Sequence, residues 1–288
     1  GPILLGGRSR ESMSYRPFIV LLAAAQLMAL GSRQTSLAAQ QPMFRSSAER
    51  VTVAVVARDQ NGQPIRGLSS ADFQVTDDGQ IREILDFRND ASPISVALLF
   101  DSSGSMHIGG KAERAREVGH LLLASMKEGT DEAALFVFDK TVRPAQPFTG
   151  AFDKVRSSFS SIAPYGATSL YDAIAETAQA LSTRPGRRAV IVLTDGVDTS
   201  SQLTPQEVSG IASAIDMPVY VVAVETSVTA GGDLTNLAHW SGGTLYAVSS
   251  LADGSVVARQ IVSELRHQYL IAFEPSPALG WHRIEVRS

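Results

Sequence analysis

The sequence has 288 residues, of which 44% are hydrophobic and 19% charged, which is enough apolar material for one large core or two modest ones. The formal net charge is -4, without long runs of one sign, which argues against a nucleic-acid partner. Because the chain has no cysteine, a disulfide scaffold, a thiolate metal site and a cysteine nucleophile are excluded.

The residue types over 1–38 follow one another as in an export signal. Met13 is the expected initiator, residues 1–12 being an upstream extension, and a basic residue precedes an apolar run over 17–30. We expect cleavage after Ala38 and a secreted or periplasmic protein. As a helix the apolar run would extend about 21 Å, short of the roughly 30 Å hydrocarbon core, so no membrane span is expected after cleavage. An uncleaved signal that anchors the protein in the membrane is the alternative.

A polar linker over 39–50 leads into a segment of short predicted strands over 51–90. Apolar and polar residues alternate at its start, a turn follows at Asp59–Gly62, and a last strand is predicted over Ile81–Phe87. This spacing predicts a small antiparallel β module. About 40 residues make a thin core, so we expect the module to pack against another part of the chain.

Between residues 93 and 266, apolar strands alternate with amphipathic helices, beginning with a strand over Ile94–Phe100 and a helix over Lys111–Lys127. This alternation predicts an α/β fold with a doubly wound, mostly parallel sheet. Residues 267–288 regain strand character. They either complete the first β module, which would make the α/β unit an insertion within it, or add an edge strand to the main sheet.

Three polar segments follow predicted strands or precede predicted helices of the α/β unit. Ligands bind outside the carboxyl ends of the strands in doubly wound sheets, so side chains from these segments are expected to meet there. All of the candidate groups carry oxygen, a donor set that suits Mg²⁺ or Mn²⁺, with Ca²⁺ as a further candidate. The candidate metal-binding residues are Asp101, Ser103, Ser105, Thr168 and Asp195.

Two carboxylates would balance a divalent charge, while neutral hydroxyls would leave the ion able to bind an external carboxylate. The alternative for Asp101 is a simple cap on the following helix. We interpret Asp198 as a solvated loop carboxylate and His107 as an exposed loop histidine.

The pattern Asp101-x-Ser103-x-Ser105, with Thr168 and Asp195 downstream, resembles the metal-ion-dependent adhesion site (MIDAS) of von Willebrand factor type A (VWA) domains. The element order over 93–266 is similar to that family. The segment before it is similar to the β segment of a bacterial exported subgroup called VWFA-related, which is frequent in acidobacteria.

The resemblance implies that the three hydroxyls touch the metal and that the two aspartates hold it directly or through water. An acidic residue of a partner protein would fill the last position. Ala167 departs from the family, because many relatives have a glycine before the threonine.

The leading interpretation is an exported, divalent-cation-dependent protein-binding module for adhesion or scaffolding, and not an enzyme. One alternative is a metal-assisted hydrolase, since strand-end aspartates with Mg²⁺ also serve phosphoryl transfer. The sequence lacks the Gly-x-x-x-x-Gly-Lys phosphate loop and the Gly-x-Ser-x-Gly nucleophile turn. The other alternative is a structural envelope component with a vestigial metal site.

Overall fold

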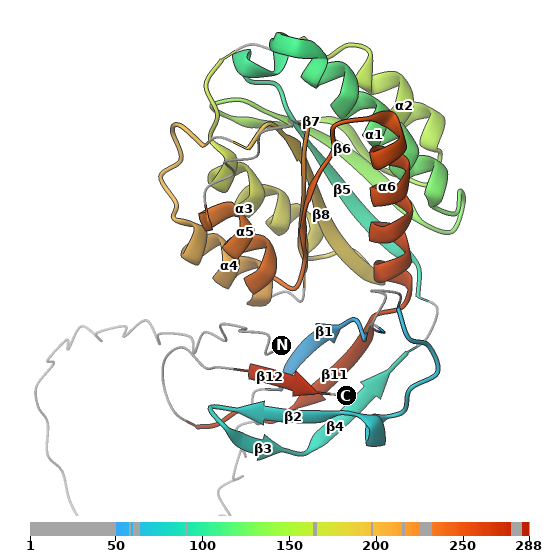
Figure 1. Ribbon diagram of the computed structural model, residues 1–288, viewed down its shortest axis with the longest axis vertical. Coiled ribbons are helices and arrows are strands. Elements are labelled where there is room, and N and C mark those ends of the chain that lie inside the picture. Colours follow the sequence, from blue (N-terminus) through green and yellow to red (C-terminus); the bar gives the residue numbers. More distant parts are fainter. Residues whose placement is uncertain are drawn as a thin grey trace, which may run out of the picture.

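The computed structural model describes residues 50–57, 59, 64–89, 92–163, 166–196, 198–214, 217–224, 232–277 and 284–287. The predicted signal peptide lies outside these residues, and so does the predicted linker apart from Arg50. The described residues form an α/β unit and a smaller β module, which lie at opposite ends of the molecule in Figure 1.

The α/β unit is built on a six-stranded sheet within the described part of the chain, in the order β10-β9-β8-β5-β6-β7. Neighbouring strands run parallel except at one edge, where β7 is antiparallel to β6. This confirms the predicted α/β fold class. The strands are β5 (Ile94–Asp101), β6 (Glu132–Phe138), β7 (Val142–Thr149), β8 (Arg187–Thr194), β9 (Val219–Ala223) and β10 (Leu245–Ala247).

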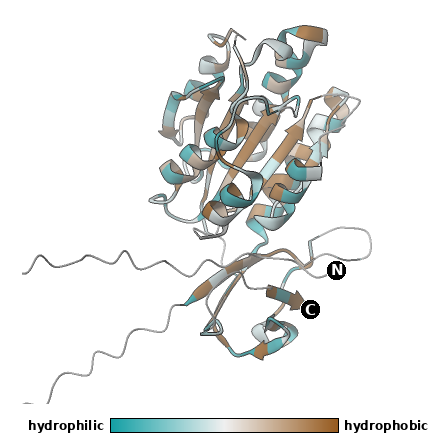
Figure 2. Cartoon of the chain, turned by 90° about the vertical axis from the view of Figure 1, so that its left-hand side faces the viewer, coloured by the Kyte–Doolittle hydropathy of each residue, from teal (hydrophilic) through white to brown (hydrophobic). Residues whose placement is uncertain are grey.

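Helices cover both faces of this sheet (Figure 1). Every residue of β5 is buried, and alternate side chains enter the two separate cores, Leu98 on one face and Leu99 on the other. A strand covered on both sides needs such a continuous apolar run, and Figure 2 shows hydrophobic strands enclosed by helices. One face carries α1 (Lys111–Ser125), α2 (Phe152–Phe159) and α6 (Leu251–Arg266), and the other α3 (Leu170–Leu181), α4 (Pro205–Ala214) and α5 (Gly232–Trp240).

The β module consists of two antiparallel three-stranded sheets, β1-β11-β4 and β12-β2-β3. Its core includes the rings of Phe73, Phe87 and Tyr269, whose centroids lie 5.1 to 5.6 Å apart. The strands are β1 (Val51–Val55), β2 (Gln74–Asp77), β3 (Gln80–Arg82), β4 (Ile84–Arg88), β11 (Tyr269–Phe273) and β12 (Ile284–Arg287).

The pairing of β11 decides between the two arrangements that the sequence left open. β11 lies between β1 and β4 and has no place in the main sheet. The α/β unit is therefore inserted into a β module whose strands come from both ends of the chain.

Two features of the strands differ from the sequence prediction. The strand predicted over Ile81–Phe87 is two strands, β3 and β4, which break at Glu83 and belong to different sheets. β7 was not predicted, because Pro144 and Pro147 break its pattern. Both prolines are tolerated because β7 is an edge strand. Most of the turn predicted at Asp59–Gly62 lies outside the described residues.

Candidate metal centre

The candidate site lies where the order of strands reverses. From β5 the chain passes to β6 on one side, whereas β8 lies on the other side of β5. In open α/β sheets such a reversal opens a crevice at the carboxyl ends of the two strands. Asp101 is the last residue of β5, and Asp195 directly follows β8. Phe100 and Leu193 are paired in register, so these two aspartates leave the sheet side by side.

Asp101 is held by hydrogen bonds from two different segments. The Ser103 backbone N–H donates to Asp101 Oδ1 at 2.8 Å, and Thr194 Oγ1, at the end of β8, donates to Asp101 Oδ2 at 2.5 Å. The Oγ atoms of Ser103 and Ser105 lie 3.0 Å apart and hydrogen-bond each other. A 3-10 helix over Gly104–Gly110 has Ser103 at its N-cap position, and α1 follows with Gly110 at its N-cap position, so Asp101 caps neither helix.

Backbone hydrogen bonds join the segment around Thr168 to the other two. The Gly104 N–H donates to the Gly166 carbonyl at 3.0 Å, and the N–H groups of Thr199 and Ser200 donate to the Thr168 carbonyl at 2.9 and 3.0 Å. The Thr168 side chain is almost fully buried, and its Oγ1 has no hydrogen-bond partner among the described residues. The structure thus links the three segments that carry the predicted ligands.

Burial disfavours the charged form of Asp101. Asp101 is completely buried, and this burial raises the pKa of its carboxyl group above its ordinary value. Hydrogen bonds from Thr194 and Ser103 oppose that rise, and the neighbouring charge of Asp195 adds to it. Asp195 Oδ2 accepts a hydrogen bond from Lys111 Nζ at 3.0 Å.

The donor set fits a hard divalent cation. Asp195 Oδ1 is buried and has no hydrogen-bond partner within the described structure, a costly arrangement that a bound cation would relieve. Within the described ranges, no three His, Asp or Glu side chains form a group that could hold a metal ion. The two aspartates would therefore depend on the hydroxyls of Ser103, Ser105 and Thr168 to complete coordination by oxygen.

Two residues near the site have roles that the sequence analysis did not predict. Thr194 bridges β8 to Asp101, and Lys111 reaches Asp195 from the first turn of α1. The interpretation of Asp198 as a solvated carboxylate is wrong, because its Oδ1 accepts hydrogen bonds from the Leu170 N–H and Ser201 Oγ. The expectation for His107 is confirmed, since this residue is exposed.

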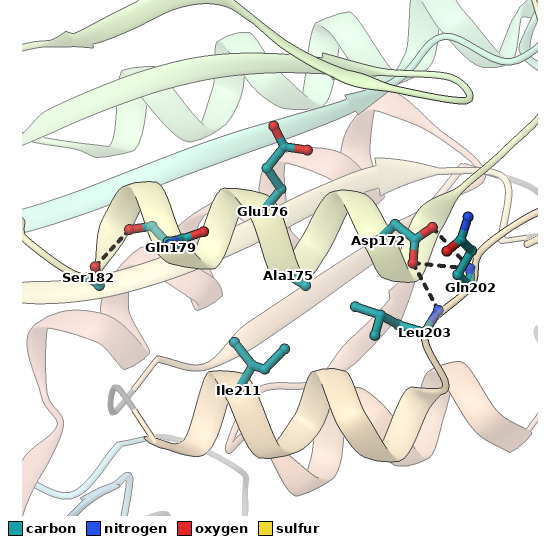
Figure 3. Close-up of a pocket in the computed structure, with 8 residues that line it drawn as sticks. All are labelled: Asp172, Ala175, Glu176, Gln179, Ser182, Gln202, Leu203 and Ile211. Atoms are coloured by element: carbon teal, nitrogen blue, oxygen red, sulfur yellow. Dashed lines mark hydrogen bonds between the residues drawn. The ribbon is translucent and has the colours of Figure 1, made fainter. Parts of the chain in front are cut away.

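A separate concavity of about 640 Å³ lies between α3 and α4 (Figure 3). Asp172, one of the residues that line it, accepts hydrogen bonds from the backbone N–H groups of Gln202 and Leu203. These bonds hold the segment that leads into α4. The candidate metal ligands do not line this concavity.

The observed fold is that of an α/β domain with a mostly parallel sheet and a crevice at the carboxyl ends of β5 and β8. Residues 96–197 match the family model of the von Willebrand factor type A domain. Over these residues the chain is similar to a VWA domain. No curated protein matches the chain.

Solved structures share this fold at low sequence identity. BatB from Bacteroides thetaiotaomicron is 19% identical, with a TM-score of 0.50 over 59% of this chain and 98% of that one. A von Willebrand factor type A protein from Catenulispora acidiphila is 14% identical, with a TM-score of 0.54 over 84% of this chain and 71% of the other. Proximal thread matrix protein 1 from the mussel byssus, with a zinc-occupied MIDAS motif, is 17% identical, with a TM-score of 0.53 over 65% and 50% of the two chains.

Proposed function

We propose that this protein is an exported, divalent-cation-dependent protein-binding module, and that its cation is held at a MIDAS formed by Asp101, Ser103, Ser105, Thr168 and Asp195. The observation that carries the proposal is the buried Asp195 Oδ1, which has no hydrogen-bond partner in the described structure and lies near a second buried carboxylate. Mg²⁺ is the expected ion, with Mn²⁺ and Ca²⁺ as alternatives.

The division of roles follows from charge. Asp101 and Asp195 would supply the negative charge that attracts the ion, and the three hydroxyls would supply neutral oxygen. An ion held in this way keeps affinity for a further anionic ligand, and we propose that an acidic side chain of a partner protein fills that position. The site would bind a protein and perform no reaction.

The surface beside the site suits a protein partner. The segment over Gly104–Gly110 presents Ile108, whose exposed fraction is 68%. A hollow of about 540 Å³ is lined by Asp139, Lys140, Gly166 and Ala167. An exposed apolar side chain beside the site would favour an acidic partner residue that has an apolar neighbour.

Export is proposed from the order of basic, apolar and small residues before Ala38. No helix within the described ranges has both the length and the apolar character that crossing a bilayer requires. The upstream β segment supports membership of the bacterial VWFA-related subgroup, and we propose that the protein acts in adhesion or scaffolding outside the cytoplasm.

The first test is calorimetric titration of the protein with Mg²⁺ and Mn²⁺. We expect Asp195→Asn to reduce cation affinity at least about tenfold, because one of the two anionic ligands is lost. Asp153→Asn is the matched control, since this side chain on α2 is 89% exposed and should leave affinity unchanged. Equal affinities in all three proteins would place the cation elsewhere and overturn the proposal.

The second test identifies the partner. Pull-down from an envelope extract, run in Mg²⁺ and in EDTA, should recover a protein only when the cation is present. Recovery that persists in EDTA would contradict the proposal. An assay panel for phosphatase and esterase activity on the same preparation separates this function from that of a metal-assisted hydrolase, and Mg²⁺-dependent turnover lost in Asp195→Asn would favour the hydrolase.

A further inference from the structure

Lys111 places a positive charge in contact with Asp195, one of the proposed metal ligands. Its Nζ lies 3.0 Å from Asp195 Oδ2, and the side chains of Lys111 and Asp195 are only 16% and 3% exposed. This is a partly buried ion pair between the first residue of α1 and the residue after β8. The contact lies in the crevice at the carboxyl ends of β5 and β8.

The backbone conformation before α1 fixes the position of Lys111. Gly109 and Gly110 both have positive φ, 67° and 71°, a conformation that residues with a side chain rarely adopt. These two glycines turn the chain from the segment containing Ser105 into α1, and the lysine is the first residue after them. Lys154 on α2, by contrast, is exposed.

We infer that Lys111 is an internal cation that competes with the divalent ion for Asp195 and thereby sets the affinity of the site; this rests on the proposed function. The ammonium group neutralises Asp195 when no ion is bound. An incoming ion must share Asp195 with this fixed charge of the same sign or displace it. Like charges at such short range in a partly desolvated site repel strongly, so the lysine weakens cation binding.

The formal charges also link the ion to its partner. Two aspartates, one lysine and one divalent ion leave the loaded site with a single excess positive charge. One carboxylate from a partner cancels that excess, whereas without Lys111 the loaded site would already be neutral. The lysine therefore makes cation and acidic partner bind cooperatively, each raising the affinity of the other.

The test is Mn²⁺ titration by calorimetry at physiological salt, using the full chain and four variants. Lys111→Met removes the charge, and Lys111→Gln removes it while keeping a side-chain donor for Asp195. Lys111→Arg keeps the charge, and Lys154→Met removes an exposed positive charge on α2. We expect both neutral variants at position 111 to bind Mn²⁺ on the order of tenfold more tightly than the unmodified protein, and the other two to match it.

Each outcome has a defined meaning. Tighter binding confined to Lys111→Met and Lys111→Gln supports the inference, as does binding by these variants when the unmodified protein shows none. If the unmodified protein binds Mn²⁺ and both neutral variants bind equally or more weakly, the inference is overturned and the proposed function stands. If no protein binds Mn²⁺, both fail.

Melting temperatures separate competition from a merely structural role. Without metal, the two neutral variants lose the ion pair to Asp195 and should melt at or below the temperature of the unmodified protein. Saturating Mn²⁺ should raise their melting temperatures more than that of the unmodified protein. An equal rise in every protein would show that Lys111 contributes only to the fold and would overturn the inference.

Discussion

Thr168 and Thr194 both lie at the strand-end crevice, but their hydroxyl groups have different surroundings. Thr168 Oγ1 has no hydrogen-bond partner among the residues described, whereas Thr194 Oγ1 donates to Asp101 and accepts from the Gly196 N–H. Valine has nearly the shape of threonine and lacks the hydroxyl. Substituting each threonine with valine therefore separates a proposed ligand from a structural hydrogen bond.

We expect Thr168→Val to leave the stability of the metal-free protein unchanged and to reduce Mg²⁺ or Mn²⁺ affinity about tenfold, because one oxygen ligand is removed. Thr194→Val should instead cost about 1–3 kcal/mol of stability even without metal, because it leaves buried polar groups unsatisfied. Chemical denaturation and calorimetric titration measure the two effects. Loss of stability in Thr168→Val together with unchanged cation affinity would assign Thr168 to the fold.

The sequence predicts which residues lie at the edge of the sheet, but it does not predict which partner a long side chain reaches. Asp101 and Asp195 could be predicted to lie close together, because the residues that follow two buried parallel strands emerge at one edge of the sheet. Lys111 could not be assigned to Asp195 in the same way. The length of its side chain and the turn at Gly109 and Gly110 decide where its amine lies.

Among the elements, the first residue of β6 carries a hydrogen-bonded charge at the end of the sheet opposite the candidate site. Glu132 accepts hydrogen bonds from Ser95 Oγ and from Arg184, which follows α3. The hydrogen bond from Arg184 is the main reason why the pKa of Glu132 lies below its ordinary value of 4.5, although partial burial opposes the shift. These contacts join β5, β6 and the chain that leads into β8.

A lowered pKa in the folded state means that the ionised form of Glu132 stabilises the fold above about pH 4.5 and that this contribution disappears as the pH falls through the lower folded value. We expect Glu132→Gln to cost about 1–2 kcal/mol near pH 6. The difference from the unmodified protein should shrink toward pH 3, where Glu132 becomes protonated. Urea denaturation across this range measures it.

Glu113→Gln provides the matched control, since Glu113 on α1 forms an exposed pair with Arg116 and should contribute little at any pH. A difference between Glu132→Gln and the unmodified protein that stayed constant from pH 6 to pH 3 would contradict the role given to Glu132.

The secondary structure elements were predictable where their pattern was continuous. β5 and β8 are buried on both faces, so their apolar runs indicate strands without help from the rest of the chain. β7 carries two prolines and is only partly buried, so its identity as a strand depends on pairing with β6. The break between β3 and β4 depends on tertiary pairing too, since the two strands enter different sheets.

In the whole molecule, one buried carboxylate holds the boundary of the inserted unit. Asp131 accepts hydrogen bonds from the Ile94 N–H at 3.1 Å and the Lys127 N–H at 2.7 Å, and it forms an ion pair with Arg266. These contacts join the start of β5, the residues after α1 and the end of α6. The chain therefore enters and leaves the α/β unit at one fixed point, and it continues from α6 into β11 within three residues.

This insertion was beyond the reach of the sequence, which left two places open for the C-terminal strands. β11 pairs with β1, more than 200 residues earlier, and an apolar strand of five residues such as β11 fits a module edge and a main-sheet edge equally well. The similarity to the Catenulispora acidiphila structure covers 84% of the chain and so extends beyond the α/β unit. That similarity concerns the fold alone.

The two units have separate hydrophobic cores, which allows their folding to be tested independently. Ile271 in β11 is fully buried and lies in register with Val53 on one side and Phe87 on the other, within the core of the β module. We expect Ile271→Ala to cost about 2–5 kcal/mol and to act on the β module alone. Ile191→Ala in β8, also fully buried, is the matched change in the other unit.

Hydrogen exchange should show which unit loosens in each variant. Ile271→Ala should speed exchange in β1, β4 and β11 while β5 and β8 keep their protection, and cation affinity should not change, because the proposed ligands lie in the α/β unit. Ile191→Ala should speed exchange in β5 and β8, while β1, β4 and β11 keep their protection. If Ile271→Ala speeds exchange equally in both units, the two cores unfold as one, because the contacts of Asp131 with Ile94 and Arg266 at the boundary transmit the loss of stability between them.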